Sequence, residues 1–146
     1  MNMPQEKRII LLVEDNPEDV RLTRRSFREN HIANDLVVVG DGAEALAYLE
    51  RASSDPEGVL PAVTLLDLNI PKIDGLELLQ RIRNHPKLRR LPVVVLTSSK
   101  EEIDLVRSYE LGANSYIQKP VEFEEFEEAV RFLGLYWLIL NVSARK

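Results

Sequence analysis

The chain has 146 residues, no cysteine and a net charge of −5. This length predicts one domain, residues 1–146, large enough to bury roughly 70% of the surface that its unfolded chain exposes. The absence of cysteine excludes disulfides, thiolate catalysis and cysteine-bound zinc, and the acidic balance argues against a general nucleic-acid binder. No apolar run approaches the roughly 18–20 residues of a membrane span, and the polar start MNMPQEKR lacks a signal-peptide pattern. We therefore expect a cytoplasmic protein.

Five apolar runs alternate with five helix-compatible segments along the chain. Strands are expected over residues 8–13, 36–39, 61–66, 92–97 and 115–118, and helices over 17–30, 42–51, 75–84, 101–111 and from Glu122 onward. Asn16 can cap the first helix, and Pro17 suits its first position. Runs of Val, Ile and Leu without polar alternation are typical of strands buried on both faces of a parallel sheet. With right-handed crossovers, this order predicts a doubly wound α/β domain.

Polar residues follow the carboxyl ends of four of these strands, at the edge where open parallel sheets bind ligands. The set comprises Glu14-Asp15, Asp67, Thr97-Ser98-Ser99 and Lys119-Pro120. One polar residue at a strand end is weak evidence, because strand ends are generally polar. Three acids, a hydroxyl and a lysine at the same edge predict a functional site.

The residue types in this set indicate phosphoryl chemistry. Three crowded carboxylates repel one another, and ionising all of them is costly unless a cation intervenes. Mg²⁺ suits such a cluster because it prefers oxygen ligands and retains several waters. A carboxylate beside the metal can attack phosphorus and become an aspartyl phosphate, while a lysine and a hydroxyl stabilise the phosphoryl oxygens. The pattern therefore predicts a phosphoryl acceptor.

These motifs, together with Pro71 and Asp74-Gly75 after the third strand, resemble the receiver domain of bacterial two-component response regulators. The resemblance covers about residues 8–133. The stretches VVVLTSS and SYELGA further resemble the small single-domain regulators paired with phytochrome-type histidine kinases. The resemblance implies a flavodoxin-like sheet in the order 2-1-3-4-5, a histidine kinase as partner, and a relay without its own output domain. Such a protein catalyses only its own phosphorylation and slow dephosphorylation.

The resemblance also implies a role for each acidic residue. Asp67 would accept the phosphoryl group from a kinase histidine and contact the metal. Asp15 would bind Mg²⁺ directly, Glu14 would act mainly through a water, and the backbone carbonyl of Asn69 would complete the protein ligands. Asn69 and Ser99 match the two positions that tune hydrolysis of the phosphate in this family.

A second group of residues would respond to the phosphorylation. Thr97 would move toward the phosphoryl group, Lys119 would pair with it, and Tyr116 would follow Thr97 as an aromatic switch. The family usually has a cis bond before the proline that matches Pro120. Tyr116 could also be an ordinary core aromatic, since amphipathic tyrosines are common at domain edges.

Three other functions compete with this interpretation. A phosphatase of the haloacid dehalogenase type also forms an aspartyl phosphate, but on its first strand and with a second Asp two residues on. Asp67 follows the third expected strand, and Asn69 stands two residues after it. A flavodoxin-like cofactor binder needs a phosphate-cradling loop after the first strand, where this chain has the acidic EDNPED. A receiver that acts only as a scaffold is the remaining alternative.

The chain beyond residue 133 predicts a C-terminal helical extension over 134–146. Phe123, Phe126, Val130, Leu133 and Trp137 follow helical spacing. Residues 135–142 are apolar nearly all round, so a helix there needs a second partner surface. The segment either folds back over its own domain or supports a two-fold homodimer through the fourth helix, the fifth strand and the extended last helix.

Overall fold

The computed structural model describes residues 9–32, 34–98 and 112–135. Its strands are β1 (Ile9–Val13), β2 (Asp35–Val39), β3 (Val63–Asp67), β4 (Val93–Thr97) and β5 (Ser115–Gln118), and its helices are α1 (Pro17–Glu29), α2 (Gly42–Ser54), α3 (Gly75–Asn84) and α5 (Phe123–Phe132). These elements match the expected ones, with most ends within two residues. The helix expected over 101–111 lies outside the described residues, and the C-terminal extension is described only as far as Leu135.

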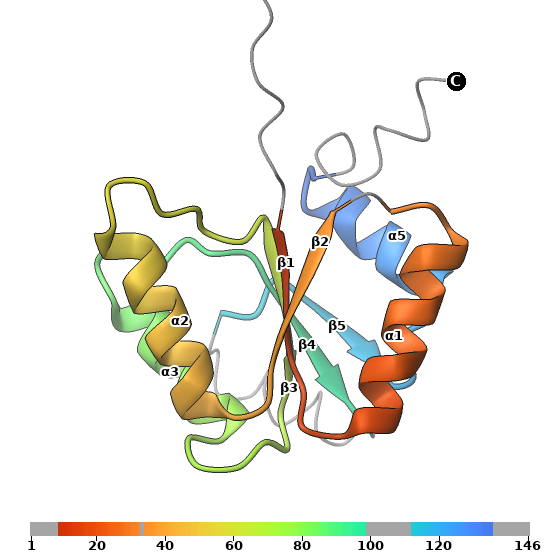
Figure 1. The fold of residues 1–146 in the computed structure, drawn as a ribbon, viewed down its shortest axis with the longest axis horizontal. Helices are drawn as coiled ribbons and strands as arrows, with labels where there is room; N and C mark the ends of the chain where they lie inside the picture. Colours follow the sequence, from red (N-terminus) through yellow and green to blue (C-terminus); the bar gives the residue numbers. More distant parts are fainter. Residues whose placement is uncertain (1–8, 33, 99–111, 136–146) are drawn as a thin grey trace, which may run out of the picture.

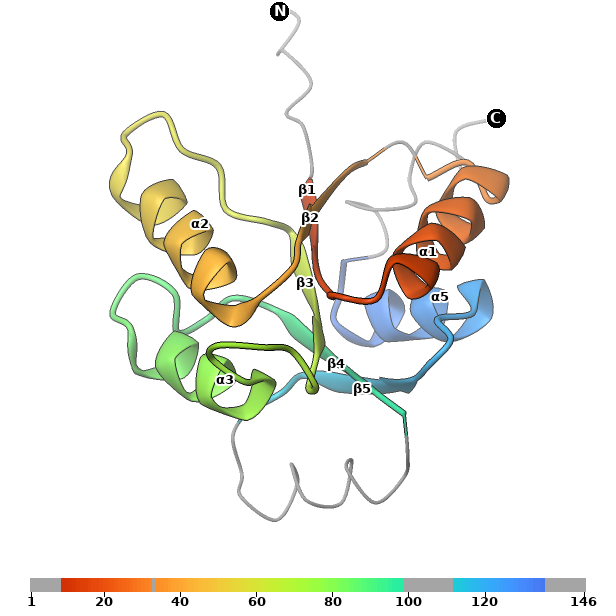
Figure 2. The ribbon, with the colours of Figure 1, turned by 60° about the horizontal axis from the view of Figure 1, so that its bottom comes forward.

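The five strands form one parallel sheet in the order β2-β1-β3-β4-β5, which confirms the doubly wound, flavodoxin-like fold. Helices α1 and α5 cover one face of the sheet, and α2 and α3 cover the other (Figures 1 and 2). The register places Asp67 opposite Leu96, and Thr97 opposite Gln118. The carboxyl ends of the central strands therefore meet at one edge.

Side-chain caps fix the start of three helices near this edge. Asn16 Oδ1 accepts hydrogen bonds from the backbone N–H groups of Glu18 and Asp19 at 2.9 and 3.4 Å. Asp41 and Asp74 cap α2 and α3 in the same way. Such caps satisfy backbone donors that have no partner within the helix, which confirms the predicted role of Asn16.

The sheet separates two hydrophobic cores, because successive residues of a strand point to opposite faces. Leu11, Val13 and Leu66 pack on the side of α2 and α3. Leu12 and Leu65 pack with Phe27 of α1 and Phe126 of α5 on the other side. The alternation continues to the strand ends, so it decides which side each site residue faces.

Gly75 lets α3 begin directly against the end of β3. A Cβ atom at this position would lie 2.5 Å from Leu68 Cα and 2.8 Å from the backbone oxygen of Asp67. Real Cβ atoms do not approach other atoms so closely, so only glycine fits without displacing the backbone around Asp67. Gly75 is thus a packing residue for the site.

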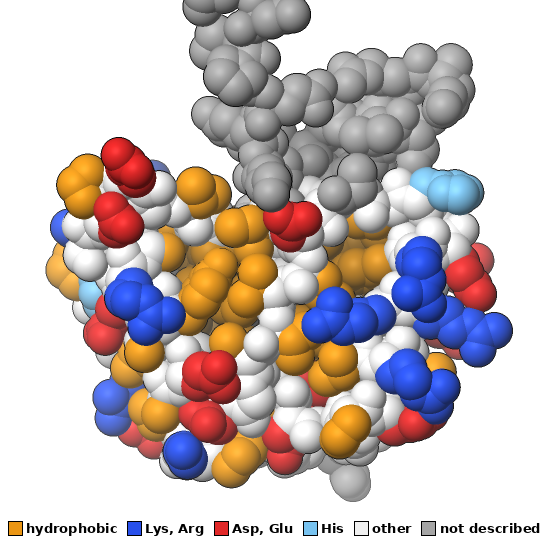
Figure 3. Space-filling model, viewed as in Figure 1, with side chains coloured by type: hydrophobic (Ala, Val, Ile, Leu, Met, Phe, Trp, Pro, Cys, Tyr) orange, Lys and Arg blue, Asp and Glu red, His pale blue; other side chains and the backbone are white. Residues whose placement is uncertain are grey.

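The exposed face of α1 carries a basic cluster, visible on the right of Figure 3. Its members are Arg21, Arg24, Arg25 and Arg28. Arg21 pairs with Glu18, and Arg25 pairs with Glu29 at 3.0 Å, in the short-range pattern of a solvated helix face. Among the described helices, none has the length and apolar character that crossing a membrane requires.

Candidate functional site

Three carboxylates converge at the carboxyl edge of the sheet. Glu14 and Asp15 follow β1, and Asp67 is the last residue of the neighbouring strand β3. One oxygen from each carboxylate lies within 4.8 Å of the other two. Glu14 and Asp67 are buried, at 2% and 1% exposure, whereas Asp15 is exposed. The structure thus brings together the acidic residues that the sequence predicted.

Lys119 reaches into this cluster from the segment between β5 and α5. Its Nζ lies 3.0 Å from Asp67 Oδ2 and 3.3 Å from Glu14 Oε1. A third carboxylate, Asp19 of α1, accepts from the same Nζ at 3.0 Å. The backbone N–H of Lys119 donates to the Thr97 carbonyl at 2.7 Å, which anchors the lysine to the end of β4. The peptide bond between Lys119 and Pro120 is cis, as the resemblance implied.

Burial and neighbouring charges perturb two of these groups. Burial, followed by hydrogen bonding to Asp67 and the charge of Asp67, raises the pKa of Glu14 to about 7. The charge of Lys119 and the backbone N–H of Asn16 oppose this rise without cancelling it. For Lys119, burial alone lowers the pKa, but hydrogen bonds to Asp19 and Asp67 and the charges of Asp67 and Glu14 outweigh it and raise the pKa. Burial is thus the largest cause of the raised Glu14 pKa, while the acids around Lys119 favour its charged form.

Hydrogen bonds hold the side chain of Asp67 in place within this cluster. Its Oδ1 accepts from the backbone N–H of Asn69 at 3.1 Å, while Oδ2 accepts from Lys119. The backbone N–H of Leu68 continues the ladder by donating to the Leu96 carbonyl at 3.3 Å. The buried strand β3 and these bonds give Asp67 a fixed position with its carboxylate at the edge of the sheet.

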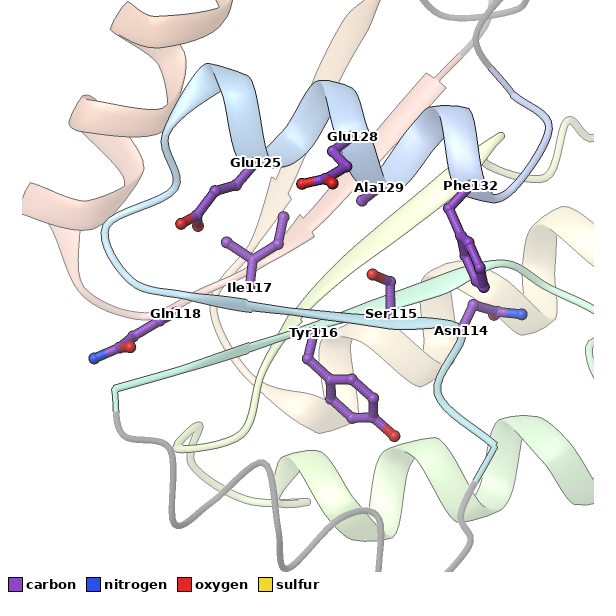
Figure 4. Close-up of a pocket in the computed structure, with 9 residues that line it drawn as sticks. All are labelled: Asn114, Ser115, Tyr116, Ile117, Gln118, Glu125, Glu128, Ala129 and Phe132. Atoms are coloured by element: carbon purple, nitrogen blue, oxygen red, sulfur yellow. The ribbon is translucent and has the colours of Figure 1, made fainter.

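Thr97 and Tyr116 lie on the opposite side of the sheet from Lys119 and Asp67. Val93 and Val95 of β4 pack on the side of α2 and α3, so alternation places the fully buried Thr97 on that side. Tyr116, which lies opposite Val95 in the register, packs half-buried against the same core. Figure 4 shows its ring pointing away from α5, while Ile117 points toward it. Thr97 and Tyr116 therefore share one face.

The roles that the sequence predicted for the site residues stay predictions, and one partner of the site was not predicted. Ser99 lies outside the described residues. Asn69 is described, with its N–H on Asp67, but its assignment as a carbonyl ligand stays a prediction. Asp19 was missed, because an acid in the first turn of α1 gives no sign in the sequence of its contact with Lys119.

The cluster fits a bound divalent cation. Its donors are carboxylate oxygens, which suit hard cations, and two of the three carboxylates are withdrawn from water. Three carboxylates converge there, and Lys119 lies within hydrogen-bonding distance of two of them. Glu14, Asp15 and Asp67 are the residues that would hold the cation.

A second feature is a groove of about 550 Å³ between β5 and α5 (Figure 4). It is lined by Asn114, Ser115, Tyr116, Ile117, Gln118, Glu125, Glu128, Ala129 and Phe132. Phe132 is 79% exposed, the highest value among the large apolar residues that the structure describes as exposed. The groove therefore combines apolar surface with acidic side chains at an edge of the sheet.

Comparison with known proteins connects this site to a family. Residues 10–131 match the family model described as the response regulator receiver domain. The bacteriophytochrome response regulator AtBRR is 52% identical over 94% of this chain and 99% of its own, with a TM-score of 0.85. Response regulator Rcp1 of Synechocystis sp. is 39% identical over 90% of this chain and 89% of its own.

Two solved structures bear on the chemistry of such sites. A Mn²⁺-bound form of response regulator Rcp1 aligns over 90% of this chain and 94% of its own, with a TM-score of 0.68 and 39% identity. The phosphorylated cyanobacterial phytochrome response regulator RcpA is 39% identical over 91% of this chain and 95% of its own, with a TM-score of 0.71.

Proposed function

The chain belongs to the response regulator receiver family, and from this premise we propose that Asp67 is its phosphoacceptor. It receives the phosphoryl group from a phosphohistidine of a histidine kinase. The observation that carries the proposal is the buried carboxylate of Asp67 held 3.0 Å from Lys119 Nζ inside a cluster of acids. A carboxylate that only ends a strand does not require burial beside a lysine and other acids.

In the transfer, a carboxylate oxygen of Asp67 attacks phosphorus and forms a P–O bond while the P–N bond to the kinase imidazole breaks. The electron pair of the broken bond stays on the imidazole nitrogen. Lys119 is close enough to exchange its contact with Asp67 Oδ2 for a phosphoryl oxygen, so its charge stays at the reacting group. The bond from the Asn69 N–H holds the carboxylate orientation during the attack.

We propose that the resident cation is Mg²⁺, held by Glu14, Asp15 and Asp67 with the Asn69 carbonyl. When bound, it supplies positive charge to the phosphoryl oxygens, as in other phosphoryl transfers. The Mn²⁺-bound Rcp1 structure supports a divalent cation in this family. The choice of Mg²⁺ rests on its preference for carboxylate oxygens and water.

The proposed output is a change around Thr97 and Tyr116. Phosphorylation replaces the single negative charge of the Asp67 carboxylate with a phosphoryl group that carries roughly 1.5–2 negative charges and three acceptor oxygens. The Thr97 hydroxyl would meet these oxygens by a movement of the end of β4. Because Thr97 and Tyr116 share a face of the sheet, a movement of one opens or fills space beside the other. The surface around β5 then differs between the two states.

The proposed partners follow from the relatives. AtBRR and RcpA carry bacteriophytochrome and phytochrome in their names, which supports a phytochrome-type histidine kinase as the donor. Autophosphorylation from small donors and slow self-catalysed hydrolysis belong to the same proposal, with Asn69 and Ser99 setting the rate of hydrolysis. A cytoplasmic location would match such a kinase partner.

We also propose a homodimer built around β5 and α5. The groove between them and the exposed Phe132 offer apolar surface at an edge strand. The fourth helix and the C-terminal extension, which the sequence assigned to the same interface, lie mostly outside the described residues. A second copy contributing its own Phe132 would cover the groove by two-fold symmetry.

One experiment tests the phosphoacceptor. The protein is incubated with acetyl phosphate and Mg²⁺, and intact mass spectrometry follows the gain of one phosphoryl group. We expect uptake by the wild type and by the loop variant Asp55→Asn, and none by Asp67→Asn or in the presence of EDTA. Equal uptake by Asp67→Asn and wild type, or no uptake by wild type, would contradict the proposal.

A further inference from the structure

Asp19 is a third carboxylate partner of Lys119. Its Oδ2 lies 3.0 Å from Lys119 Nζ, as close as Asp67 and closer than Glu14 at 3.3 Å. The Asp19 side chain is 24% exposed, so water screens this pair less than an ion pair on the open surface. The ammonium group is thus shared among three acids that come from three different segments of the chain.

The three acids differ in what else they do. Glu14 and Asp67 belong, with Asp15, to the group whose oxygens lie within 4.8 Å of one another and can hold a cation, and Asp19 is not a member of that group. A cation and Lys119 therefore compete for Glu14 and Asp67 but not for Asp19. Asp19 is the partner that Lys119 can keep when the cation site is filled.

Both ends of this ion pair are anchored through the main chain. The backbone N–H of Asp19 is bound by the Asn16 side chain in the first turn of α1, where the helix dipole also favours a negative charge. The backbone N–H of Lys119 is bound to the Thr97 carbonyl at 2.7 Å. The contact is therefore set by two fixed segments, not by two mobile surface side chains.

We infer that Asp19 is a positioning residue, which holds the Lys119 ammonium beside Asp67 and keeps it from displacing the cation from Glu14 and Asp67. This inference rests on the proposed function, since it assigns the partner of the lysine that meets the phosphoryl group. Without Asp19, the charge of Lys119 is balanced by Glu14 and Asp67 alone. The lysine then binds their oxygens more strongly, and Mg²⁺ binds less strongly.

The test is a double-mutant cycle on Mg²⁺ affinity, measured by calorimetry on wild type, Asp19→Asn, Lys119→Met and the double variant. We expect Asp19→Asn to raise the Kd for Mg²⁺ about three- to tenfold, the scale of one partly exposed charge-assisted hydrogen bond. In the Lys119→Met background the same change should have almost no effect, because no lysine remains to compete. Asp19→Glu should restore part of the affinity.

Glu18→Gln is the matched control. Glu18 lies in the same helical turn and pairs with Arg21, so its removal reports the long-range effect of one lost negative charge. The inference is overturned if Asp19→Asn weakens Mg²⁺ binding by the same factor in the wild-type and Lys119→Met backgrounds. It is also overturned if Asp19→Asn changes the Kd no more than Glu18→Gln.

The readout separates this inference from the proposed function, because Mg²⁺ titration needs no phosphodonor. Coupling between Asp19 and Lys119 in a protein that takes up no phosphate would sustain the inference and reject the proposed function. Normal phosphate uptake without coupling between Asp19 and Lys119 would reject the inference and sustain the proposed function. Thermal melting of all variants confirms that each is folded before its Kd is compared.

Discussion

Glu14 is the carboxylic acid of the site whose pKa the fold raises. It is nearly fully buried, and burial together with Asp67 raises its pKa to about 7 from an ordinary value of 4.5. The metal-free folded protein therefore binds a proton at Glu14 over a pH range in which the unfolded chain has lost it. By linkage, folding stability from this residue is greatest at low pH and falls as the pH rises from about 4.5 to about 7.

This linkage gives a prediction for protein in EDTA. As the pH rises from 5 to 7, the Glu14 contribution should make the free energy of unfolding fall by about 1–3 kcal/mol. A shift of one pKa unit corresponds to about 1.36 kcal/mol, and relaxation of the structure around Glu14 reduces the full value. Urea denaturation at several pH values measures the slope for wild type and for Glu14→Gln. In Glu14→Gln, the fall of the unfolding free energy with pH should be smaller by this amount. Saturating Mg²⁺ should reduce the fall in wild type in the same way. Identical slopes for both proteins in EDTA would contradict the assignment.

At the same scale, the sequence predicted the cluster but not its full set of partners. Glu14, Asp15, Asp67 and Lys119 each follow a strand, and parallel strands bring their carboxyl ends to one edge, so their meeting could be predicted. Asp19 lies within a helix, where an acid in the first turn has the ordinary role of complementing the helix dipole. Its contact with Lys119 depends on how the segment after β5 passes α1, which local patterns do not encode.

Among the elements, α3 is joined to its neighbours by one arginine in its last turn. Arg83 donates through Nε to the Gly112 carbonyl at 2.9 Å and through Nη1 to the carbonyls of Leu91 and Arg89 at 2.7 and 3.1 Å. Its Nη2 donates to Asn114 Oδ1 at 2.9 Å. Burial lowers the pKa of Arg83, yet the guanidinium satisfies groups at the starts of both β4 and β5.

Arg83→Met should therefore lower the free energy of unfolding by about 2–4 kcal/mol, since carbonyls beneath the guanidinium lose their donors. Arg81→Met is the control on the same helix. Arg81 is half-exposed and pairs with Glu77 four residues earlier, an interaction worth about 0.3–0.5 kcal/mol. Urea denaturation compares the two. Similar losses for Arg81 and Arg83 would show that the bonds of Arg83 contribute little to stability.

The structure adds one leucine to the inward face of α3 that helical spacing of Leu76, Leu79 and Ile82 does not include. Leu79 and Ile82 are fully buried and Leu76 packs half-buried against the core, and Leu78 is fully buried as well. Three leucines in four positions leave the buried face ambiguous in the sequence. The close contact of Gly75 with Leu68 turns the helix so that positions 75, 78, 79 and 82 share the inner face.

For the whole molecule, the strand order and the two helical layers followed from the succession of elements and the family resemblance. What the sequence could not provide is the shape of the surface between elements, such as the groove between β5 and α5. That groove depends on the spacing of an edge strand and the last helix. Phe132 was outside the predicted inward stripe of α5, and the structure exposes it beside the groove.

If this groove belongs to a homodimer interface, Phe132→Ser should raise the dimer dissociation constant at least about tenfold, as expected for loss of a buried aromatic anchor. Size-exclusion chromatography with light scattering, at tens of micromolar protein, measures the dimer fraction. Val59→Ser, which removes a half-exposed apolar side chain from the α2–β3 connection, should leave it unchanged. A monomeric wild type, or equal behaviour of the two variants, would reject this interface.

The separation of two cores by the sheet has a consequence for how such a protein can change over evolutionary time. By the alternation along the strands, Asp67 and Glu14 lie on the side of α1 and α5, whereas Thr97 and Tyr116 lie on the side of α2 and α3. Among the residues that the structure describes, the bond from the Lys119 N–H to the Thr97 carbonyl links the two sides at the carboxyl edge. If Asp67 is the phosphoacceptor proposed above, substitutions on the Tyr116 side would change the surface around β5 without touching the contacts of Asp67 with Lys119 and Asn69.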